Sequence, residues 1–255
     1  MLYNQPNMAQ TITDNPPIKV EHLEKSFGER KILDDFNLTV NAEENVVVLG
    51  KSGAGKSVLI KCIIGLLKPD SGTIKVFGDE ITGLSVTKLD KVRTKIGFLF
   101  QGNALYDSMT IRENLEFPLR RHWINISQRE TDQMVMEALD NVKLPYTADM
   151  MPAELSGGMQ KRIALARTMI LKPDIILYDE PTTGLDPVTA RDIDDLILEL
   201  QHKYKTSSII ISHDMNCVKN TSDRVVLLLD GKCYTEGTYQ ALEQSEDEKI
   251  KQFFE

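Results

Sequence analysis

The stretch Gly50-Lys51-Ser52-Gly53-Ala54-Gly55-Lys56-Ser57 decides the fold of this 255-residue chain. It fits the pattern GxxxxGK followed by Ser or Thr, and it lies between an apolar run at 46–49 and a helical pattern at 57–67. Its glycines let backbone N–H groups converge on phosphate oxygens, and the helix start adds the positive end of its dipole. We expect Lys56 to reach the β and γ phosphates and Ser57 to offer its hydroxyl to Mg²⁺. The alternative, a glycine-rich turn without a ligand, does not account for these flanking segments.

An acidic pair follows a second apolar run and complements this loop. Asp179 and Glu180 come directly after residues 175–178. A phosphate loop needs a metal-holding carboxylate on a neighbouring strand, so Asp179 is the candidate Mg²⁺ ligand. Glu180, at the carboxyl end of the same strand, is placed to polarise a water for attack on the γ phosphate. Taken without the loop, the pair fits a solvated acidic turn before Pro181 equally well.

Short apolar runs alternate with helix-period segments along much of the remaining chain. Such runs indicate strands buried on both faces, and their alternation with helices predicts an α/β fold with a mainly parallel sheet. The runs are residues 46–49, 98–100, 175–178, 208–211 and 225–229. Residues 36–40 and 73–77 instead favour a small antiparallel sheet near the N-terminus. Strand signals vanish between Gln101 and Leu155, so we expect an inserted helical subdomain at about 102–168, with a capping box at Ser127 and Glu130.

The composition excludes several classes of protein. A content of 41% hydrophobic and 27% charged residues is typical of a globular protein and not of a disordered one. Its longest apolar run, 225–229, is far too short to span a bilayer, and residues 1–17 form a polar leader without the pattern of a secretory signal. The cysteines Cys62, Cys217 and Cys233 fit neither a disulfide framework nor a metal knuckle. A net charge of −8 argues against nucleic acid as a partner.

A third motif, Leu155-Ser156-Gly157-Gly158-Met159-Gln160, lies between the loop and the acidic pair. With these motifs in this order the sequence resembles the ATPases of the ATP-binding cassette (ABC) family, whose signature is LSGGQ. The resemblance implies a P-loop fold of the ABC type. It also implies that Ser156, Gly157, Gly158 and Met159 meet the γ phosphate bound by the opposite subunit, as a second anion site at a helix start. Alone, this segment would fit a flexible linker or a helix cap.

Further residues match the family one by one. Phe27 lies where the family stacks an aromatic ring on adenine, although a single Phe is more often part of a core. Gln101 resembles the glutamine that touches Mg²⁺ and the attacking water. Asp186, in Gly184-Leu185-Asp186, resembles the loop that crosses the dimer interface, and it also suits the cap of a helix that begins at Pro187. His213 resembles the switch histidine that contacts the γ phosphate.

Two positions depart from the family pattern. Val58 stands where the family usually has Thr, and Met159 where it usually has Gln. Neither change removes a catalytic group, because Val58 still donates its backbone N–H to a phosphate and the glycines keep the anion site. We therefore expect changed nucleotide affinity, not inactivity. The cofactors implied are ATP and Mg²⁺.

The resemblance covers about residues 18–240 and implies an ABC ATPase domain at 18–242, followed by an acidic C-terminal tail at 243–255. Since a single cassette supplies half of each composite site, hydrolysis requires a second copy of the chain. The family also implies an integral-membrane permease that docks near Gln101 to Leu119. Apolar residues there are Met109, Ile111, Leu115, Phe117, Pro118 and Leu119. The alternative for most of them is the core of the helical subdomain itself.

A narrower resemblance is to the Mla-type ATPases that serve MCE-protein lipid transporters. The segments that carry it are residues 100–110, 113–114, 117–120, 151–155 and 250–254. It implies an energising subunit of phospholipid transport, at the cytoplasmic face of the inner membrane, bound to its permease and working with an MCE-type lipid-binding protein. The alternatives are the ATPase of another ABC importer or exporter and a soluble ABC protein without a transport role. No residue of this chain is implied to touch lipid.

Overall fold

A computed structural model describes residues 15–121 and 126–254, and its centre is a six-stranded sheet with the order β10-β9-β3-β8-β7-β6. The strands are β3 (Asn45–Leu49), β6 (Ile96–Leu99), β7 (Ile175–Asp179), β8 (Ser207–Ser212), β9 (Arg224–Leu229) and β10 (Lys232–Gly237). All neighbouring pairs are parallel except β9 and β10. The predicted mainly parallel sheet is confirmed, and each expected run lies on one of its strands except for Phe100, which follows β6. The antiparallel edge strand β10 was not predicted.

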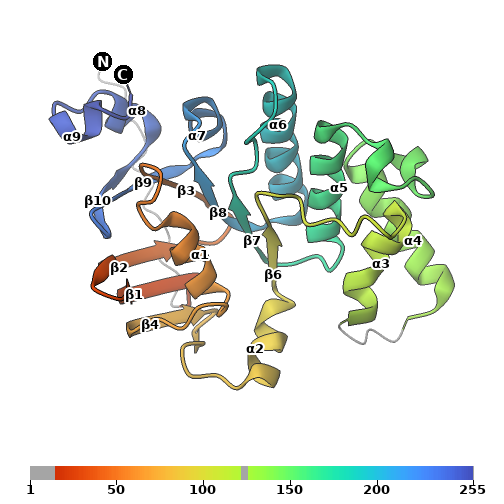
Figure 1. The fold of residues 1–255 in the computed structure, drawn as a ribbon, viewed down its shortest axis with the longest axis horizontal. Coiled ribbons are helices and arrows are strands. Elements are labelled where there is room, and N and C mark those ends of the chain that lie inside the picture. Colours follow the sequence, from red (N-terminus) through yellow and green to blue (C-terminus); the bar gives the residue numbers. More distant parts are fainter. Residues whose placement is uncertain (1–14, 122–125, 255) are drawn as a thin grey trace, which may run out of the picture.

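A second sheet, antiparallel throughout, lies beside the first (Figure 1). Its strand order is β2-β1-β4-β5, made by β1 (Ile18–Phe27), β2 (Arg30–Val40), β4 (Ser71–Val76) and β5 (Asp79–Glu80). Phe36, Leu38 and Val40 are buried in alternation with outward residues, as their period predicts. The predicted antiparallel sheet near the N-terminus is confirmed. The leader expected at 1–17 lies almost entirely outside the described residues.

The central sheet is buried on both faces because alternate residues of its strands enter different cores. Val46 and Val48 pack with α1 (Lys56–Ile63), α2 (Val86–Arg93) and the antiparallel sheet. Val47 and Leu49 pack with the opposite core, which includes α5 (Gly157–Met169), α6 (Pro187–Tyr204) and α7 (Met215–Thr221). This double burial explains why the strands read as continuous apolar runs.

Helix α1 ends at Ile63, earlier than the predicted end at Leu67. Gly65 lies at a φ of +67°, and the N–H of Leu66 turns back to donate to the Lys61 carbonyl at 2.8 Å. Glycine is the residue that takes this left-handed conformation without strain, so it ends the helix. The apolar residues that follow continue the helical pattern in sequence without continuing the helix.

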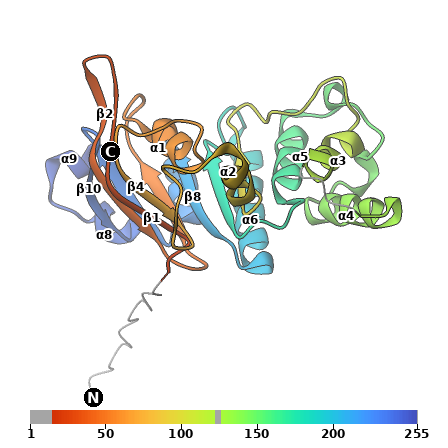
Figure 2. The same ribbon diagram turned by 90° about the horizontal axis from the view of Figure 1, so that it is seen from below.

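The helical subdomain lies to one side of both sheets (Figure 2). It contains α3 (Ile111–Arg121), α4 (Gln128–Asn141), the 3₁₀ turns η1 (Pro145–Thr147) and η2 (Pro152–Glu154), and α5. The predicted capping box is present: the Glu130 N–H donates to Ser127 Oγ at 3.3 Å and the Ser127 N–H donates to Glu130 Oε2 at 2.8 Å. No helix in the described ranges is both long and apolar enough to cross a membrane.

The prediction that the apolar residues at 109–119 form a permease-binding surface is wrong for three of them. Ile111, Leu115 and Leu119 of α3 are buried, and they pack with the core of the helical subdomain. The physical reason is their helical spacing of four residues, which places all three on the face of α3 that α4 and α5 cover. Only the half-buried Met109, Phe117 and Pro118 of that set remain partly accessible.

The acidic segment expected as a tail at 243–255 is packed on the domain as far as the structure describes it. It holds the end of α8 (Tyr239–Glu243) and all of α9 (Glu248–Lys251). Ile250 is buried, and the ring of Phe254 packs edge to face on Tyr239 at a centroid distance of 5.3 Å. The negative charges lie on the outer side of a segment whose apolar residues join the core.

Candidate active site

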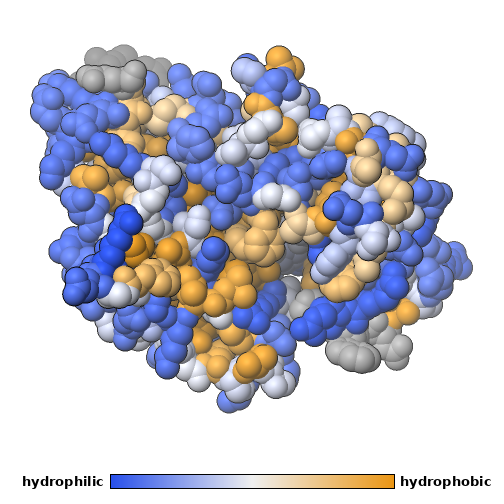
Figure 3. Space-filling model, viewed as in Figure 1, coloured by the Kyte–Doolittle hydropathy of each residue, from blue (hydrophilic) through white to orange (hydrophobic). Residues whose placement is uncertain are grey.

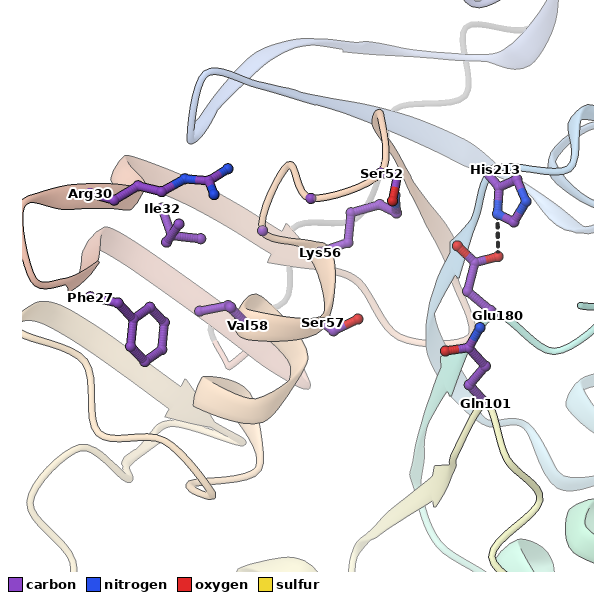
Figure 4. A pocket seen from close by; sticks show the side chains of 12 residues that line it. Phe27, Arg30, Ile32, Ser52, Lys56, Ser57, Val58, Gln101, Glu180 and His213 are labelled. Atoms are coloured by element: carbon purple, nitrogen blue, oxygen red, sulfur yellow. Dashed lines mark hydrogen bonds and ion pairs between the residues drawn. The ribbon is translucent and has the colours of Figure 1, made fainter.

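A pocket of about 490 Å³ opens at the carboxyl ends of the central strands (Figure 4). Phe27 and Val58 lie at one end, Gln101, Glu180 and His213 at the other, and Lys56 and Ser57 between them. The pocket also contains Ser52, Gly53 and Gly55 of the loop, and Arg30 and Ile32. The structure thus gathers most of the predicted site residues around one elongated cavity.

The loop at 50–57 takes its shape from glycine. Gly55 lies at a φ of +107°, and a Cβ atom there would approach Ile32 Cγ2 to 2.8 Å. Gly50 is equally restricted, because a Cβ would lie 2.8 Å from the Leu228 carbonyl oxygen. Gly55 precedes the first residue of α1 and has no side chain to cap it, so the first N–H groups of the helix are left for a ligand.

The ammonium of Lys56 is turned toward the loop itself. Lys56 Nζ donates to the carbonyl oxygens of Gly50 at 2.6 Å and Lys51 at 3.2 Å, and the residue is only 7% exposed. Burial lowers the pKa of Lys56, while the negative charges of Glu180 and Asp179 oppose that shift. In the described parts of the chain no carboxylate lies within ion-pair distance of this ammonium. A phosphate group is the counter-charge that fits it.

Ser57 and Asp179 form the candidate metal site. Ser57 Oγ donates to Asp179 Oδ1 at 3.2 Å, which places two oxygen ligands side by side behind the pocket. Burial raises the pKa of Asp179 and the charge of Glu180 adds to that shift. Mg²⁺ prefers oxygen ligands and keeps several waters, so one carboxylate, one hydroxyl and the nearby side chain of Gln101 fit it. A cation here would relieve the cost of a buried carboxylate.

Glu180 is held in an unusual backbone conformation at the far end of the pocket. Its φ is +53°, in the left-handed region, and its N–H donates to the Ile211 carbonyl of β8 at 2.9 Å. His213 Nδ1 lies 2.8 Å from Glu180 Oε2, and Thr183 Oγ1 donates to the same oxygen at 3.3 Å. Non-glycine residues in this region are uncommon and cluster at functional sites. The strand ends therefore fix a carboxylate and an imidazole against each other.

The motif at 156–159 and Asp186 lie outside this pocket. Ser156 caps α5, where its Oγ accepts from the Met159 N–H at 3.3 Å, and Gly157 and Gly158 form the first turn. Asp186 caps α6 by accepting from Val188 and Thr189, each at 3.1 Å. The starts of α5 and α6 are packed closely together. A Cβ atom on Gly158 would lie 2.5 Å from Thr189 Cγ2, so a larger residue would not fit between them. These residues cannot complete the pocket of their own chain.

Three residues of the loop shape the pocket without lining it. Gly50 and Lys51 contribute carbonyl oxygens to the Lys56 ammonium, and the N–H of Ala54 donates to the Lys51 carbonyl at 3.1 Å. Sequence reasoning missed Arg30 and Ile32, which line the end of the pocket near Phe27. The signal was present, since Gly28-Glu29 is a two-residue turn that pairs Phe27 with Arg30. Figure 3 shows hydrophobic residues gathered over α1 and the neighbouring strands, around this end.

Comparisons with known proteins give one consistent family. A model of the family described as "ABC transporter" matches residues 33–183. A solved dimeric ATP-binding cassette, in a post-hydrolysis state bound to ADP and Pi, is 33% identical, has a TM-score of 0.78, and the match covers 87% of this chain and 98% of that one.

Several curated relatives align along nearly the whole chain. The intermembrane phospholipid transport system ATP-binding protein MlaF of Haemophilus influenzae is 39% identical over 236 residues, covering 92% of this chain and 89% of its own. The probable ribonucleotide transport ATP-binding protein mkl of Mycobacterium tuberculosis has the same identity, but the chain spans only 66% of its length. The glutamate/glutamine/aspartate/asparagine transport ATP-binding protein BztD of Rhodobacter capsulatus is 35% identical over 244 residues, covering 95% of this chain and 91% of its own.

Proposed function

The chain belongs to the ABC transporter family of ATP-binding proteins, and we propose that it is the ATP-hydrolysing subunit of a membrane transporter that moves phospholipid. The observation that carries the ATPase assignment is the single pocket in which Lys56, Ser57, Glu180 and His213 converge. The similarity to MlaF supports phospholipid as the cargo, since it extends over nearly the full length of both chains.

The shape of the pocket suggests how ATP lies in it. The ring of Phe27 and the side chain of Val58 offer an apolar surface to adenine, and the loop receives the phosphates. Lys56 exchanges two carbonyl contacts for the β and γ phosphates, which supply the negative charge that it lacks. Mg²⁺, held by Ser57, Asp179 and Gln101, would neutralise phosphate charge during the transfer.

Glu180 supplies the base for hydrolysis in this proposal. Its carboxylate lines the end of the pocket opposite Phe27, where the γ phosphate would lie. There it can accept a proton from a water that attacks the γ phosphate in line. His213, 2.8 Å away, orients the carboxylate before ATP binds and is free to turn toward the γ phosphate afterwards. The strained backbone at Glu180 limits the positions that the carboxylate can reach.

A second copy of the chain completes each site. Ser156 caps α5, Gly157, Gly158 and Met159 form its first turn, and none of the four lines the pocket of its own chain. The solved cassette that the chain resembles is a dimer bound to ADP and Pi, which supports closure of two copies around two nucleotides. Asp186, at the touching start of α6, would lie at the same interface.

Ser156→Arg should abolish ATP-dependent dimerisation without weakening ATP binding by the single subunit. A guanidinium with its long side chain blocks the close approach of the α5 start to the partner's nucleotide. The measurement is light scattering after size exclusion with ATP, made in a Glu180→Gln background so that the nucleotide persists. Ser127→Arg is the matched control, since it removes the same kind of cap from α4. Dimers of the Ser156→Arg variant would contradict the role across the interface.

The permease contact is proposed for the surface beside Gln101. The exposed Phe100 and the half-buried Pro118 line a cleft of about 180 Å³ between β6, α3 and α5. The exposed ring of Tyr106 packs on Phe117 of α3 at a centroid distance of 4.8 Å. Clustered exposed aromatic residues are typical of protein interfaces. A helix of the membrane subunit seated there would contact the Gln101 segment directly and so sense the nucleotide.

Copurification tests the transport assignment. A chain tagged at its C-terminus, extracted gently from membranes of its own cell, should bring down a permease and an MCE-type protein. That result supports phospholipid transport at the cytoplasmic face of the inner membrane. A permease with a periplasmic amino-acid binding protein would support the BztD-like alternative instead. A dimer free of membrane proteins would support an ABC protein without a transport role.

A further inference from the structure

The backbone that follows β6 is held by side chains of α5. Lys161 Nζ donates to the Gln101 carbonyl oxygen at 3.0 Å, and Arg167 Nη1 donates to the Ala104 carbonyl oxygen. Thr168 Oγ1 donates to the Phe98 carbonyl oxygen at 3.4 Å. In Figure 1 this segment leaves β6 and runs across toward α3, passing α5 on its way. One helix thus holds the chain before, at and after Gln101.

Lys161 is buried at a position where its charge lowers the stability of the fold. It is 2% exposed, and within the described ranges the Gln101 carbonyl is its one hydrogen-bond acceptor and no carboxylate pairs with it. An ammonium buried without an acid destabilises a fold relative to an apolar side chain of the same size. Packing alone would therefore favour Met or Leu here, so the contact with Gln101 is what this side chain adds.

The segment after Gln101, which Lys161 contacts, has a strained backbone. Asn103 and Ala104 have φ values of +60° and +54°, a conformation that side chains with a Cβ rarely adopt. The N–H of Ala104 donates to the Gly102 carbonyl at 2.6 Å, which closes a tight turn directly after Gln101. Strain of this kind persists only where surrounding groups hold it.

We propose that Lys161 is a positioning residue for Gln101, coupling the α5 helix to the metal end of the pocket. The proposal rests on the proposed role of Gln101 in hydrolysis. Ser156, for which a contact with the partner's nucleotide is proposed above, caps the helix that carries Lys161. A displacement of α5 when the dimer closes therefore moves the Gln101 carbonyl with it. Gln101 enters its catalytic position as the opposite nucleotide is engaged.

Lys161→Met tests this coupling in the full chain. Methionine has nearly the length of lysine and no donor, so kcat for ATP hydrolysis should fall about tenfold while KM for ATP stays within about twofold. Lys161→Arg keeps a donor and should retain most of the rate. Lys161→Leu serves as a second apolar variant if the first folds poorly. The decisive measurement is a double-mutant cycle: in a Gln101→Ala background, Lys161→Met should cause no further loss.

Stability and a matched control separate positioning from packing. Lys161→Met should keep or raise Tm, because it removes an unpaired buried charge. Lys172→Met, in the turn that follows α5, where Lys172 pairs with Glu137, should leave kcat unchanged. A tenfold loss that repeats in the Gln101→Ala background would overturn the proposal in favour of a general structural role. If Lys161→Met hydrolyses ATP at the normal rate while Gln101→Ala is slow, the positioning role of Lys161 is overturned and the role of Gln101 stands. If Gln101→Ala also hydrolyses ATP at the normal rate, the proposed role of Gln101 in hydrolysis is overturned too.

Discussion

Glu180→Gln should lower kcat for ATP hydrolysis by about 100-fold to 10,000-fold while the Kd for ATP changes less than about threefold. The amide keeps the shape of the carboxylate and can still contact His213, so the pocket survives. What it loses is a group that accepts a proton from the attacking water. The backbone holds residue 180 at the pocket, with a φ of +53° and an N–H bond to β8, so the amide should occupy the position of the carboxylate.

The same variant should convert ATP into a dimerising ligand. In the wild-type chain hydrolysis removes the nucleotide that holds two copies together, whereas Glu180→Gln keeps it, so size exclusion with ATP should show a stable dimer. The rate is checked by phosphate release and the affinity by titration with a fluorescent nucleotide. Glu199→Gln is a suitable control, since that exposed carboxylate pairs with Lys143 and does not line the pocket. A variant that hydrolyses ATP near the normal rate would show that Glu180 is not the base.

The sheet explains why so much of the pocket was predictable from sequence. Asp179 ends β7, and Ser57 and His213 come after the ends of β3 and β8. These three strands are neighbours in a parallel sheet. The carboxyl ends of parallel strands share one edge, so motifs spaced far apart along the chain meet there. Continuous apolar runs also marked the strands clearly, because the sheet is covered on both faces.

Other features depend on contacts that no local pattern encodes. Ile111, Leu115 and Leu119 are apolar whether a partner or their own subdomain covers them, and only the packing of α3 decides between the two. Lys161 reads as a surface lysine in sequence, yet it is buried against the Gln101 carbonyl, 60 residues away along the chain. Long-range placement of this kind follows from tertiary packing, not from spacing.

Lys56→Ala should raise the Kd for ATP about 100-fold or more, since losing one partner of a buried charge pair costs about 3–5 kcal/mol. Without nucleotide the ammonium is buried on two carbonyl oxygens, and Glu180 and Asp179 act on it only from beyond ion-pair distance among the described residues. Phosphate is therefore its first full counter-charge. Alanine leaves that phosphate charge in the pocket without a direct partner, so the loss falls on binding as well as on hydrolysis.

Thermal stability separates this loss from unfolding. Without nucleotide, Lys56→Ala removes a buried charge whose pKa is lowered by burial, so Tm should stay level or rise. With ATP, the wild-type Tm should increase by mass action while that of the variant should not. Lys88→Ala, an exposed lysine of α2, controls for the change of charge and should bind ATP normally. An unchanged Kd in a binding titration of Lys56→Ala would contradict the assignment of residues 50–57 as the phosphate-binding loop. Arg30, the other described lysine or arginine that lines the pocket, lies at the end near Phe27.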